Sequence, residues 1–174
     1  MDSTGTTDAG ERLEVARFIP FAAEQIFAVL TDPMGHVDID ASGMLQDAEG
    51  KPVTRAGDSF VVHMDREALG DLPMGRYDVT VTIETFEADR AISWSVLGTV
   101  RPGIGHTFGY RLEPVDGGTT VTSVYDWSTA SAEWRTSGIF PVVSQAALRG
   151  TLGILERVVR RRTADPQQAQ AVSV

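Results

Sequence analysis

The sequence has no cysteine, a single lysine (Lys51) and no long uninterrupted run of apolar residues. The lack of cysteine excludes disulfide bonds and thiol chemistry. No apolar run approaches the ~20 residues that a membrane-spanning helix needs, and the polar, acidic start of the chain differs from a signal peptide. From these absences we expect a cytoplasmic protein with no membrane as a partner.

Positive charge is scarce as well: 15 basic residues stand against 24 acidic ones, which gives a net charge of −9. Nucleic acids and anionic membrane surfaces attract basic proteins, so neither is an expected partner. The one basic run, Arg160 to Arg162, is typical of the last turn of a helix, where cations favour the helix dipole. Arginine outnumbers lysine fourteen to one, a bias typical of GC-rich bacterial genomes.

The rest of the composition is that of a globular protein. Of the 174 residues, 42% are apolar and 22% are charged, which is enough for one domain with its own core. Both ends of the chain are polar and lack core-forming residues. We therefore predict a disordered N-terminal tail over residues 1–11, a single domain over 12–162 and a mobile C-terminal tail over 163–174.

Alternation of apolar and polar residues predicts strands along most of the domain. The clearest strand is Arg76 to Phe86, in which Tyr77, Val79 and Val81 share one face. Short turns such as Asp116-Gly117-Gly118 join consecutive strands and therefore indicate an antiparallel sheet. The predicted strands span residues 12–19, 42–45, 59–64, 76–86, 91–97, 105–113 and 119–127.

Helices are predicted only near the two ends of the domain, which favours an α+β fold in which a long helix covers the apolar face of the sheet. Pro141 suits the first turn of that long helix. Gly150 and Gly153 lie in its interior, where each costs about 1 kcal/mol relative to alanine. Either these glycines pack closely against a strand, or they leave room for a ligand. The predicted helices span residues 22–30, 33–38 and 138–162.

This order of elements, together with particular stretches of sequence, resembles the SRPBCC superfamily, the START and birch-pollen-allergen-like helix-grip proteins, and above all its bacterial polyketide cyclase/dehydrase-like branch. The resemblance implies a curved antiparallel sheet of about six to seven strands wrapped around the long C-terminal helix, with a ligand cavity between them. Cyclases, lipid carriers, hormone receptors and co-chaperones share this scaffold. The resemblance is carried by FIPFAAEQIFAVLTDP (18–33), HVDIDASG (36–43), AGDSFVVHM (56–64), ETFEADRAISW (84–94), GHTFGYRLEP (105–114) and TTVTSVYDWS (119–128).

His106 and Tyr110 are the candidate catalytic pair. Both fall on the inward face of their strand, which Leu112 indicates. In an apolar cavity a neutral imidazole exchanges a proton near neutral pH, and a phenol hydrogen-bonds a carbonyl or an enolate. Together they suit an aldol-type ring closure or a dehydration. The alternative is structural: His106 bonds a backbone group near a strand end, and Tyr110 packs with its hydroxyl at the cavity rim.

Large residues at inward positions predict a binding surface for a flat hydrophobic molecule. Each buried aromatic taken alone is more often part of a core, but several on one sheet, opposite a helix that contains two glycines, favour a ligand. The predicted ligand-binding residues are Phe60, Met64, Tyr77, Trp94, Phe108, Tyr125, Trp127, Gly150 and Gly153, together with His36 and Asp40.

His36 and Asp40 are four residues apart, so on a helix they would meet on one face. A carboxylate that orients a histidine is the start of a general base; the alternative is a local cap that fixes the second helix against the next strand. With Asp38 they supply too few ligands for a metal site, so no metal is expected. The chain has neither a phosphate-binding glycine loop nor a nucleophilic serine motif, so no cofactor is expected.

The sequence thus predicts a protein that binds a small hydrophobic, aromatic or polyketide-like molecule. Two forms of this function stay open: cofactor-free cyclisation or dehydration through acid–base catalysis and oxyanion stabilisation, and carriage or sensing without turnover. A co-chaperone-like interaction module is a distant third, because the outward strand faces are polar. The expected oligomeric state is a monomer or a homodimer.

Overall fold

A computed structural model describes residues 10–100 and 102–165, and over this part of the chain it shows one seven-stranded antiparallel sheet. The order along the sheet is β1-β7-β6-β5-β4-β3-β2. Strands β2 to β7 each pair with their neighbours in sequence, and β1 pairs with β7 at one edge of the sheet. The strands are β1 (Arg12–Ile19), β2 (Leu45–Glu49), β3 (Ser59–Asp65), β4 (Arg76–Glu87), β5 (Ala91–Leu97), β6 (Thr107–Val115) and β7 (Gly118–Asp126).

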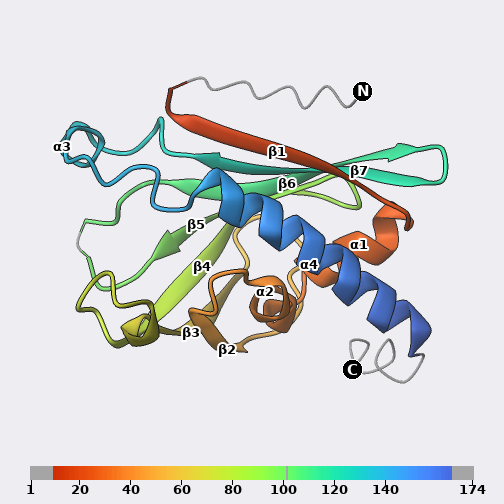
Figure 1. Ribbon diagram of the computed structural model, residues 1–174, viewed down its shortest axis with the longest axis horizontal. Coiled ribbons are helices and arrows are strands. Elements are labelled where there is room, and N and C mark those ends of the chain that lie inside the picture. Colours follow the sequence, from red (N-terminus) through yellow and green to blue (C-terminus); the bar gives the residue numbers. More distant parts are fainter. Residues whose placement is uncertain (1–9, 101, 166–174) are drawn as a thin grey trace.

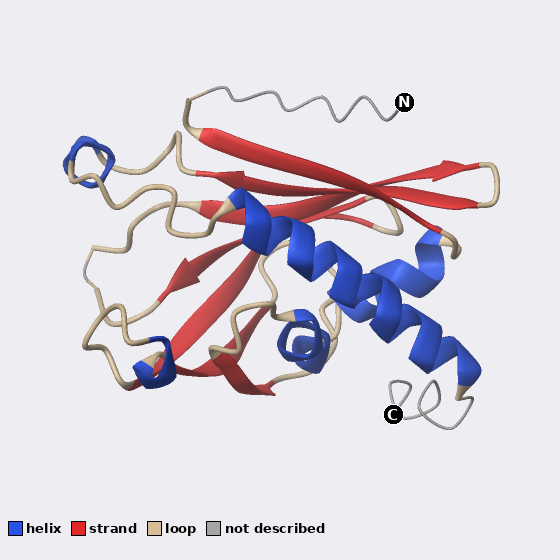
Figure 2. Ribbon diagram, in the orientation of Figure 1, coloured by secondary structure: helices blue, strands red, loops and turns tan. Residues whose placement is uncertain are grey.

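The two helices that follow β1 and the long C-terminal helix lie along one face of this sheet, and the long helix crosses it (Figure 1). The sheet curves so that β1, β7 and β6 run along one side of this helix and β2 to β4 lie on the other side (Figures 1 and 2). The predicted α+β helix-grip architecture, with two short helices after the first strand, is confirmed. The helices are α1 (Ala23–Leu30), α2 (Pro33–Ile39), the 3₁₀ turn η1 (Glu67–Leu69), α3 (Ala132–Thr136) and α4 (Gln145–Ala164).

The stretch of α4 from Leu152 to Val159 lies in the core. Leu152, Leu155 and Val159 are at most 1% exposed, and the helix packs against β1, β7, α1 and α2. Burying each of these side chains contributes about 1.5–3 kcal/mol to folding. The long helix covers the apolar face of the sheet together with α1, which contacts β6, and α2, which contacts β2 and β3.

The long helix begins later than predicted. It starts at Gln145 rather than near Gly138, and the Ser144 hydroxyl caps it by accepting a hydrogen bond from the Ala147 N–H at 3.1 Å. Pro141 therefore precedes the helix instead of lying in its first turn. The helix also runs two residues further than predicted, to Ala164. A serine cap satisfies one of the orphan N–H groups of the first turn, and this decides where the helix begins.

Two shorter stretches also differ from the prediction. The second strand, predicted over 42–45, runs over Leu45–Glu49 as β2 and pairs with β3 through a bulge between Leu45 and Asp47. The short helix α3 lies between β7 and α4, where no helix was predicted. Residues 1–9 and 166–174, which make up most of the two predicted tails, lie outside the described residues.

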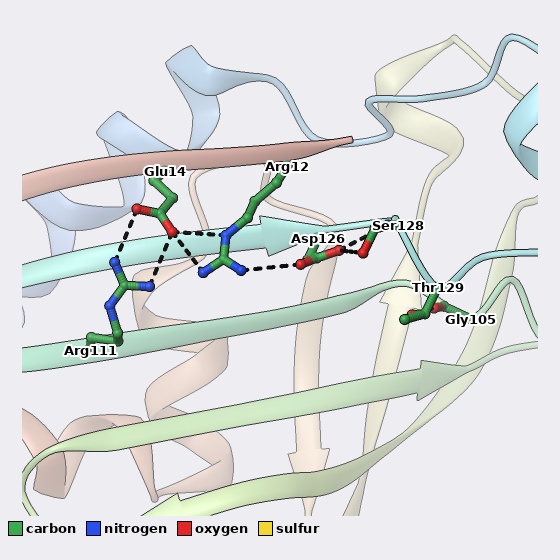
Figure 3. Close-up of polar contacts among 7 residues, drawn as sticks. All are labelled: Arg12, Glu14, Gly105, Arg111, Asp126, Ser128 and Thr129. Carbon is green, nitrogen blue, oxygen red and sulfur yellow. Dashed lines mark hydrogen bonds and ion pairs between the residues drawn. The ribbon is translucent and has the colours of Figure 1, made fainter. Parts of the chain in front are cut away.

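Charged side chains tie the β1 edge of the sheet together on the face that points away from α4 (Figure 3). Arg111 on β6 reaches across β7 and donates to both carboxylate oxygens of Glu14 on β1, at 3.1 and 3.0 Å. Arg12 donates to the same carboxylate at 2.8 Å and reaches Asp126 at 3.3 Å. Hydrogen bonds from Arg111 lower the pKa of Glu14. These partly exposed pairs link β1, β6 and β7 and add little stability one by one.

Gly35 fixes how closely α2 approaches α1, and it provides a test of the fold. A Cβ added there would collide with the carbonyl oxygen of Val29. Because a backbone atom cannot move aside cheaply, we expect Gly35→Ala to lower the free energy of unfolding by roughly 1–3 kcal/mol in urea denaturation. Gly98→Ala is the control, since its Cβ would meet its nearest atom at an ordinary 3.7 Å. Equal stability of the two variants would contradict this packing.

Candidate functional site

A cavity of about 750 Å³ lies between the sheet and the N-terminal half of α4. Side chains from β3 to β7 form its floor, and Ala147, Leu148 and Thr151 of α4 form part of its roof. Most of the lining is apolar. Leu72 and Val142 line it and are also exposed, so they mark its mouth. The volume is in the range of pockets that enclose a drug-sized molecule.

The cavity brings together eight of the predicted site residues and leaves out five. The eight come from α2, β3, β4, β5, β6 and the residues beside these elements; they are His36, Asp40, Met64, Tyr77, Trp94, His106, Phe108 and Tyr110. The five outside the lining are Phe60, Tyr125, Trp127, Gly150 and Gly153. The structure gives the positions of these residues but does not test what they do, so their catalytic and ligand-binding assignments stay predictions.

His106 stands immediately before β6, and the backbone around it is held in place. Gly105 has φ of +85°, a conformation that favours glycine, and its carbonyl accepts a hydrogen bond from the Thr129 hydroxyl at 2.9 Å, visible in Figure 3. The imidazole Nδ1 lies 2.8 Å from the Tyr125 hydroxyl. The edges and faces of Phe108 and Phe140 surround the ring at centroid distances of 5.1 and 6.1 Å.

Burial controls the charge of this histidine. The side chain is 5% exposed, and desolvation lowers the pKa of His106 from 6.5 to about 4. The imidazole is therefore neutral at pH 7, with only about one molecule in a thousand protonated. It offers the cavity a hydrogen bond rather than a charge.

Tyr110 is the second polar group of the cavity floor. It pairs in register with Ser123 on β7, and the two side chains interact. Burial raises the pKa of Tyr110 well above its ordinary value of 10, and the nearby negative charge of Asp40 acts in the same direction. The phenol thus stays protonated. Its ring lies 5.8 Å from that of Trp94, which joins it to the aromatic wall of the cavity.

The aromatic residues form two layers. Trp94 and Phe108 face the cavity, with their rings nearly parallel at 6.3 Å. Tyr125 stacks behind Phe108 at 4.6 Å, and Trp127 packs on Tyr125 at 5.1 Å. Phe60 packs instead on the His36 ring at 5.0 Å. The second layer supports the first and is not exposed to the cavity.

His36 and Asp40 do not form the predicted pair. His36 Nε2 lies 2.8 Å from the carbonyl oxygen of Leu30, and burial lowers the pKa of His36. The Asp40 carboxylate accepts from the Ser42 N–H and hydroxyl at 2.9 and 2.7 Å and from the Leu45 N–H at 3.0 Å. This is the capping arrangement that was left open as the alternative: Asp40 ties the end of α2 to the start of β2.

Gly150 and Gly153 do not create the cavity. A Cβ at Gly150 would meet the Cβ of Ala41 at 3.5 Å, and one at Gly153 would meet Nη1 of Arg17 at 3.8 Å. Both are ordinary van der Waals contacts, so neither close packing against a backbone strand nor room for a ligand explains these residues. The surface that they face is the loop after α2 and the arginine of β1, and not the aromatic wall.

Sequence reasoning missed an ion pair at the mouth. Arg66, just after β3, donates to both carboxylate oxygens of Asp71 at 2.9 and 2.8 Å, and both residues line the cavity. The Arg66 side chain is only 12% exposed. The hydrogen bonds that Arg66 donates to Asp71 raise the pKa of Arg66. The five-residue spacing across a glycine turn, Gly70, is the signal that could have pointed to this pair.

The described residues also bear on two other features, a metal site and a membrane-spanning helix. Within residues 10–100 and 102–165, no three His, Asp or Glu side chains lie close enough together to hold a metal ion. In the same part of the chain, no helix is long and apolar enough to cross a membrane.

Solved structures share this fold. They include the Zhui aromatase/cyclase from a Streptomyces species, with a TM-score of 0.62 and 16% identity over 87% of this chain and 94% of that one. An AHSA1-like protein from Aeromonas hydrophila has a TM-score of 0.59 and 18% identity over 88% and 95%. A protein from Mycobacterium smegmatis reaches 0.63 and 16% over 94% and 98%.

The resemblance to the helix-grip proteins is thereby confirmed at the level of the fold. No protein-family model and no curated protein matches the chain in sequence. At these identities a structural likeness shows the architecture alone, so the activity must be argued from the cavity itself.

The position of Gly150 gives a stability prediction. A helix-interior glycine costs about 1 kcal/mol relative to alanine, and the space beside Gly150 accepts a methyl group. We expect Gly150→Ala to raise the free energy of unfolding by up to about 1 kcal/mol, measured by urea denaturation, and to leave the cavity intact. A loss of stability would show that α4 needs a close backbone approach at this position.

The low pKa of His106 gives a pH prediction. Because the folded-state pKa of about 4 lies below the ordinary 6.5, the unfolded chain binds this proton more readily. The contribution of neutral His106 is therefore complete above pH 6.5 and is lost as the pH falls through about 4. Between pH 7 and pH 5 this loss is on the order of 1–2 kcal/mol.

The measurement compares the protein with His106→Gln, by urea denaturation at both pH values. We expect the variant to lose less stability on acidification by that amount. The pKa of His36 is also lowered, and hydrogen bonds from the His63 ring to Asp78 and Glu49 raise the pKa of His63. Both histidines are present in both proteins, so their contributions cancel. An equal loss in the two proteins would mean that His106 titrates normally.

Proposed function

We propose that this protein binds a flat, largely apolar small molecule, aromatic or polyketide-like, in the cavity under α4. The observation that carries the proposal is the lining: a wall of Trp94 and Phe108, aliphatic side chains of β3 and β4, and two uncharged polar groups on the floor, His106 and Tyr110. An apolar pocket with a few placed polar groups is the usual form of a small-molecule site.

The ionisation of the two polar groups favours binding over proton transfer. An imidazole with a pKa of about 4 is a poor general acid at neutral pH, and a phenol with a raised pKa does not supply a base. Efficient acid–base catalysts have pKa values near the operating pH. Carriage or sensing of the ligand therefore ranks first.

Cofactor-free ring closure or dehydration ranks second. It is favoured by one feature, since two neutral donors in a dry site suit an oxyanion that develops on a bound carbonyl. The fold shared with an aromatase/cyclase agrees with this second candidate. A co-chaperone-like role ranks last, because exposed Asp78, Thr80 and Glu84 make the outer face of β4 polar.

Filling the cavity tests the proposal. Ala147 lines the cavity from the first turn of α4, and its neighbour Ala146 is exposed and lies outside the lining. We expect native mass spectrometry of protein from its own host to show a bound small molecule in the unchanged protein and in Ala146→Trp, and none in Ala147→Trp, whose indole would occupy the space.

The same experiment separates the two leading candidates. A bound molecule that is recovered unchanged after incubation with the protein indicates a carrier or sensor, whereas a recovered product that has lost one water indicates dehydration or cyclisation. Retention of the molecule by a folded Ala147→Trp variant would contradict the proposed site.

A further inference from the structure

The hydrogen bond between His106 and Tyr125 decides which hydrogen-bonding group the cavity offers to a ligand. A neutral imidazole carries its proton on either Nδ1 or Nε2, and the other nitrogen is then an acceptor. The partner of one nitrogen fixes the tautomer and so fixes what the other nitrogen does. In this protein Nδ1 has a partner, the Tyr125 hydroxyl at 2.8 Å.

The second nitrogen, Nε2, opens on the cavity. His106 lines the cavity, and only 5% of the residue is exposed. Within the described part of the chain, no side-chain nitrogen or oxygen that is sealed from solvent lacks a hydrogen-bond partner. Tyr125 takes Nδ1. Nε2 therefore faces the space that a ligand would fill.

The surroundings of Tyr125 determine the direction of the hydrogen bond. Tyr125 is 0% exposed, and the partner of its hydroxyl group is Nδ1 of His106. If Nδ1–H donated to this oxygen, the phenolic O–H would need another acceptor inside the core. A buried donor without an acceptor costs about 1–3 kcal/mol. The arrangement that satisfies both groups has Tyr125 O–H donating to Nδ1.

We infer that Tyr125 is a positioning residue that holds His106 as an Nε2–H donor, so that the cavity selects flat apolar molecules carrying a neutral hydrogen-bond acceptor such as a ketone or quinone oxygen. This inference rests on the proposed function and narrows it. Tyr125 acts through His106, because its own ring lies outside the cavity lining, stacked behind Phe108.

Neutral acceptors fit this site better than acids. A carboxylate moved from water onto two uncharged donors keeps most of its desolvation cost. The cation that lines the mouth, Arg66, is already held by both oxygens of Asp71. A carbonyl oxygen needs only the one hydrogen bond that Nε2–H supplies.

The binding test uses fluorenone and fluorene, two flat probes that differ only in a carbonyl group. Binding is followed by the fluorescence of Trp94 and Trp134, which line the cavity. One neutral hydrogen bond corresponds to roughly a 5- to 10-fold preference for fluorenone. In Tyr125→Phe we expect this preference to fall below about 2-fold, since the imidazole loses its fixed tautomer.

Thr119→Val is the matched control. Thr119 is a buried hydroxyl on the same strand that donates to the carbonyl oxygen of Phe21 at 2.9 Å, far from His106 along β7. Loss of the Thr119 hydroxyl should lower the stability of the protein about as much as loss of the Tyr125 hydroxyl does. The Thr119→Val variant should nevertheless keep the preference for fluorenone. A preference that survives in Tyr125→Phe, or that disappears equally in Thr119→Val, would overturn the inference.

The tautomer is measured directly by ¹⁵N NMR of histidine-labelled protein, with the His106 signals assigned by their loss in His106→Gln. We expect the Nε2–H form in the unchanged protein and a mixture in Tyr125→Phe; an Nδ1–H form in the unchanged protein would refute the inference. Equal binding of both probes would also refute it and leave the proposed function standing. If neither probe binds, the proposed function fails and the ligand selectivity fails with it.

Discussion

The packing of one half of α4 against β1, β7 and α1 is the contact on which the other features depend. Leu152, Leu155 and Val159 are sealed there with almost no exposed surface, which fixes the axis of the helix at its C-terminal end. Toward its N-terminal end, the helix lies over the cavity, with Ala147, Leu148 and Thr151 in the lining. The strands below the helix stay in place because their hydrogen bonds hold them in register. The cavity is the space between these strands and the N-terminal end of the helix.

Burial then determines the chemistry of that space. Desolvation holds His106 in its neutral form and keeps the proton on Tyr110, and the same apolar surroundings strengthen each hydrogen bond that these groups make. The charged groups of the lining have partners within the protein: Arg66 and Asp71 neutralise each other at the mouth, and the Asp40 carboxylate accepts hydrogen bonds from Ser42 and Leu45. Under the proposed function, the site therefore discriminates between ligands by shape and by hydrogen-bond direction, and long-range electrostatic attraction has little part in it.

Much of the fold was predictable from local patterns, since alternation such as that of Arg76 to Phe86 reports directly on which face of a strand is buried. The start of α4 was not predictable: Phe140 and Val143 do pack against the core, but from an irregular segment before the helix, and periodicity alone cannot separate the two conformations. The alternation of side chains along the strands placed Trp94 and Phe108 correctly on the inner face of the sheet. This alternation does not report how deeply a side chain is buried. Tyr125 also points inward and was therefore expected in the cavity, but it lies one layer behind the lining.

The mouth of the cavity is built from loops of distant parts of the chain, with Leu72 on one side and Val142 on another, both exposed. Neither loop contributes to the sealed end of the core. Openings confined to such segments require much less free energy than unfolding of the domain. Under the proposed function, a ligand can thus enter and leave while the sheet and the C-terminal half of α4 stay folded. The residence time of the ligand and the lifetime of the fold are then set by different parts of the chain and can change independently during evolution.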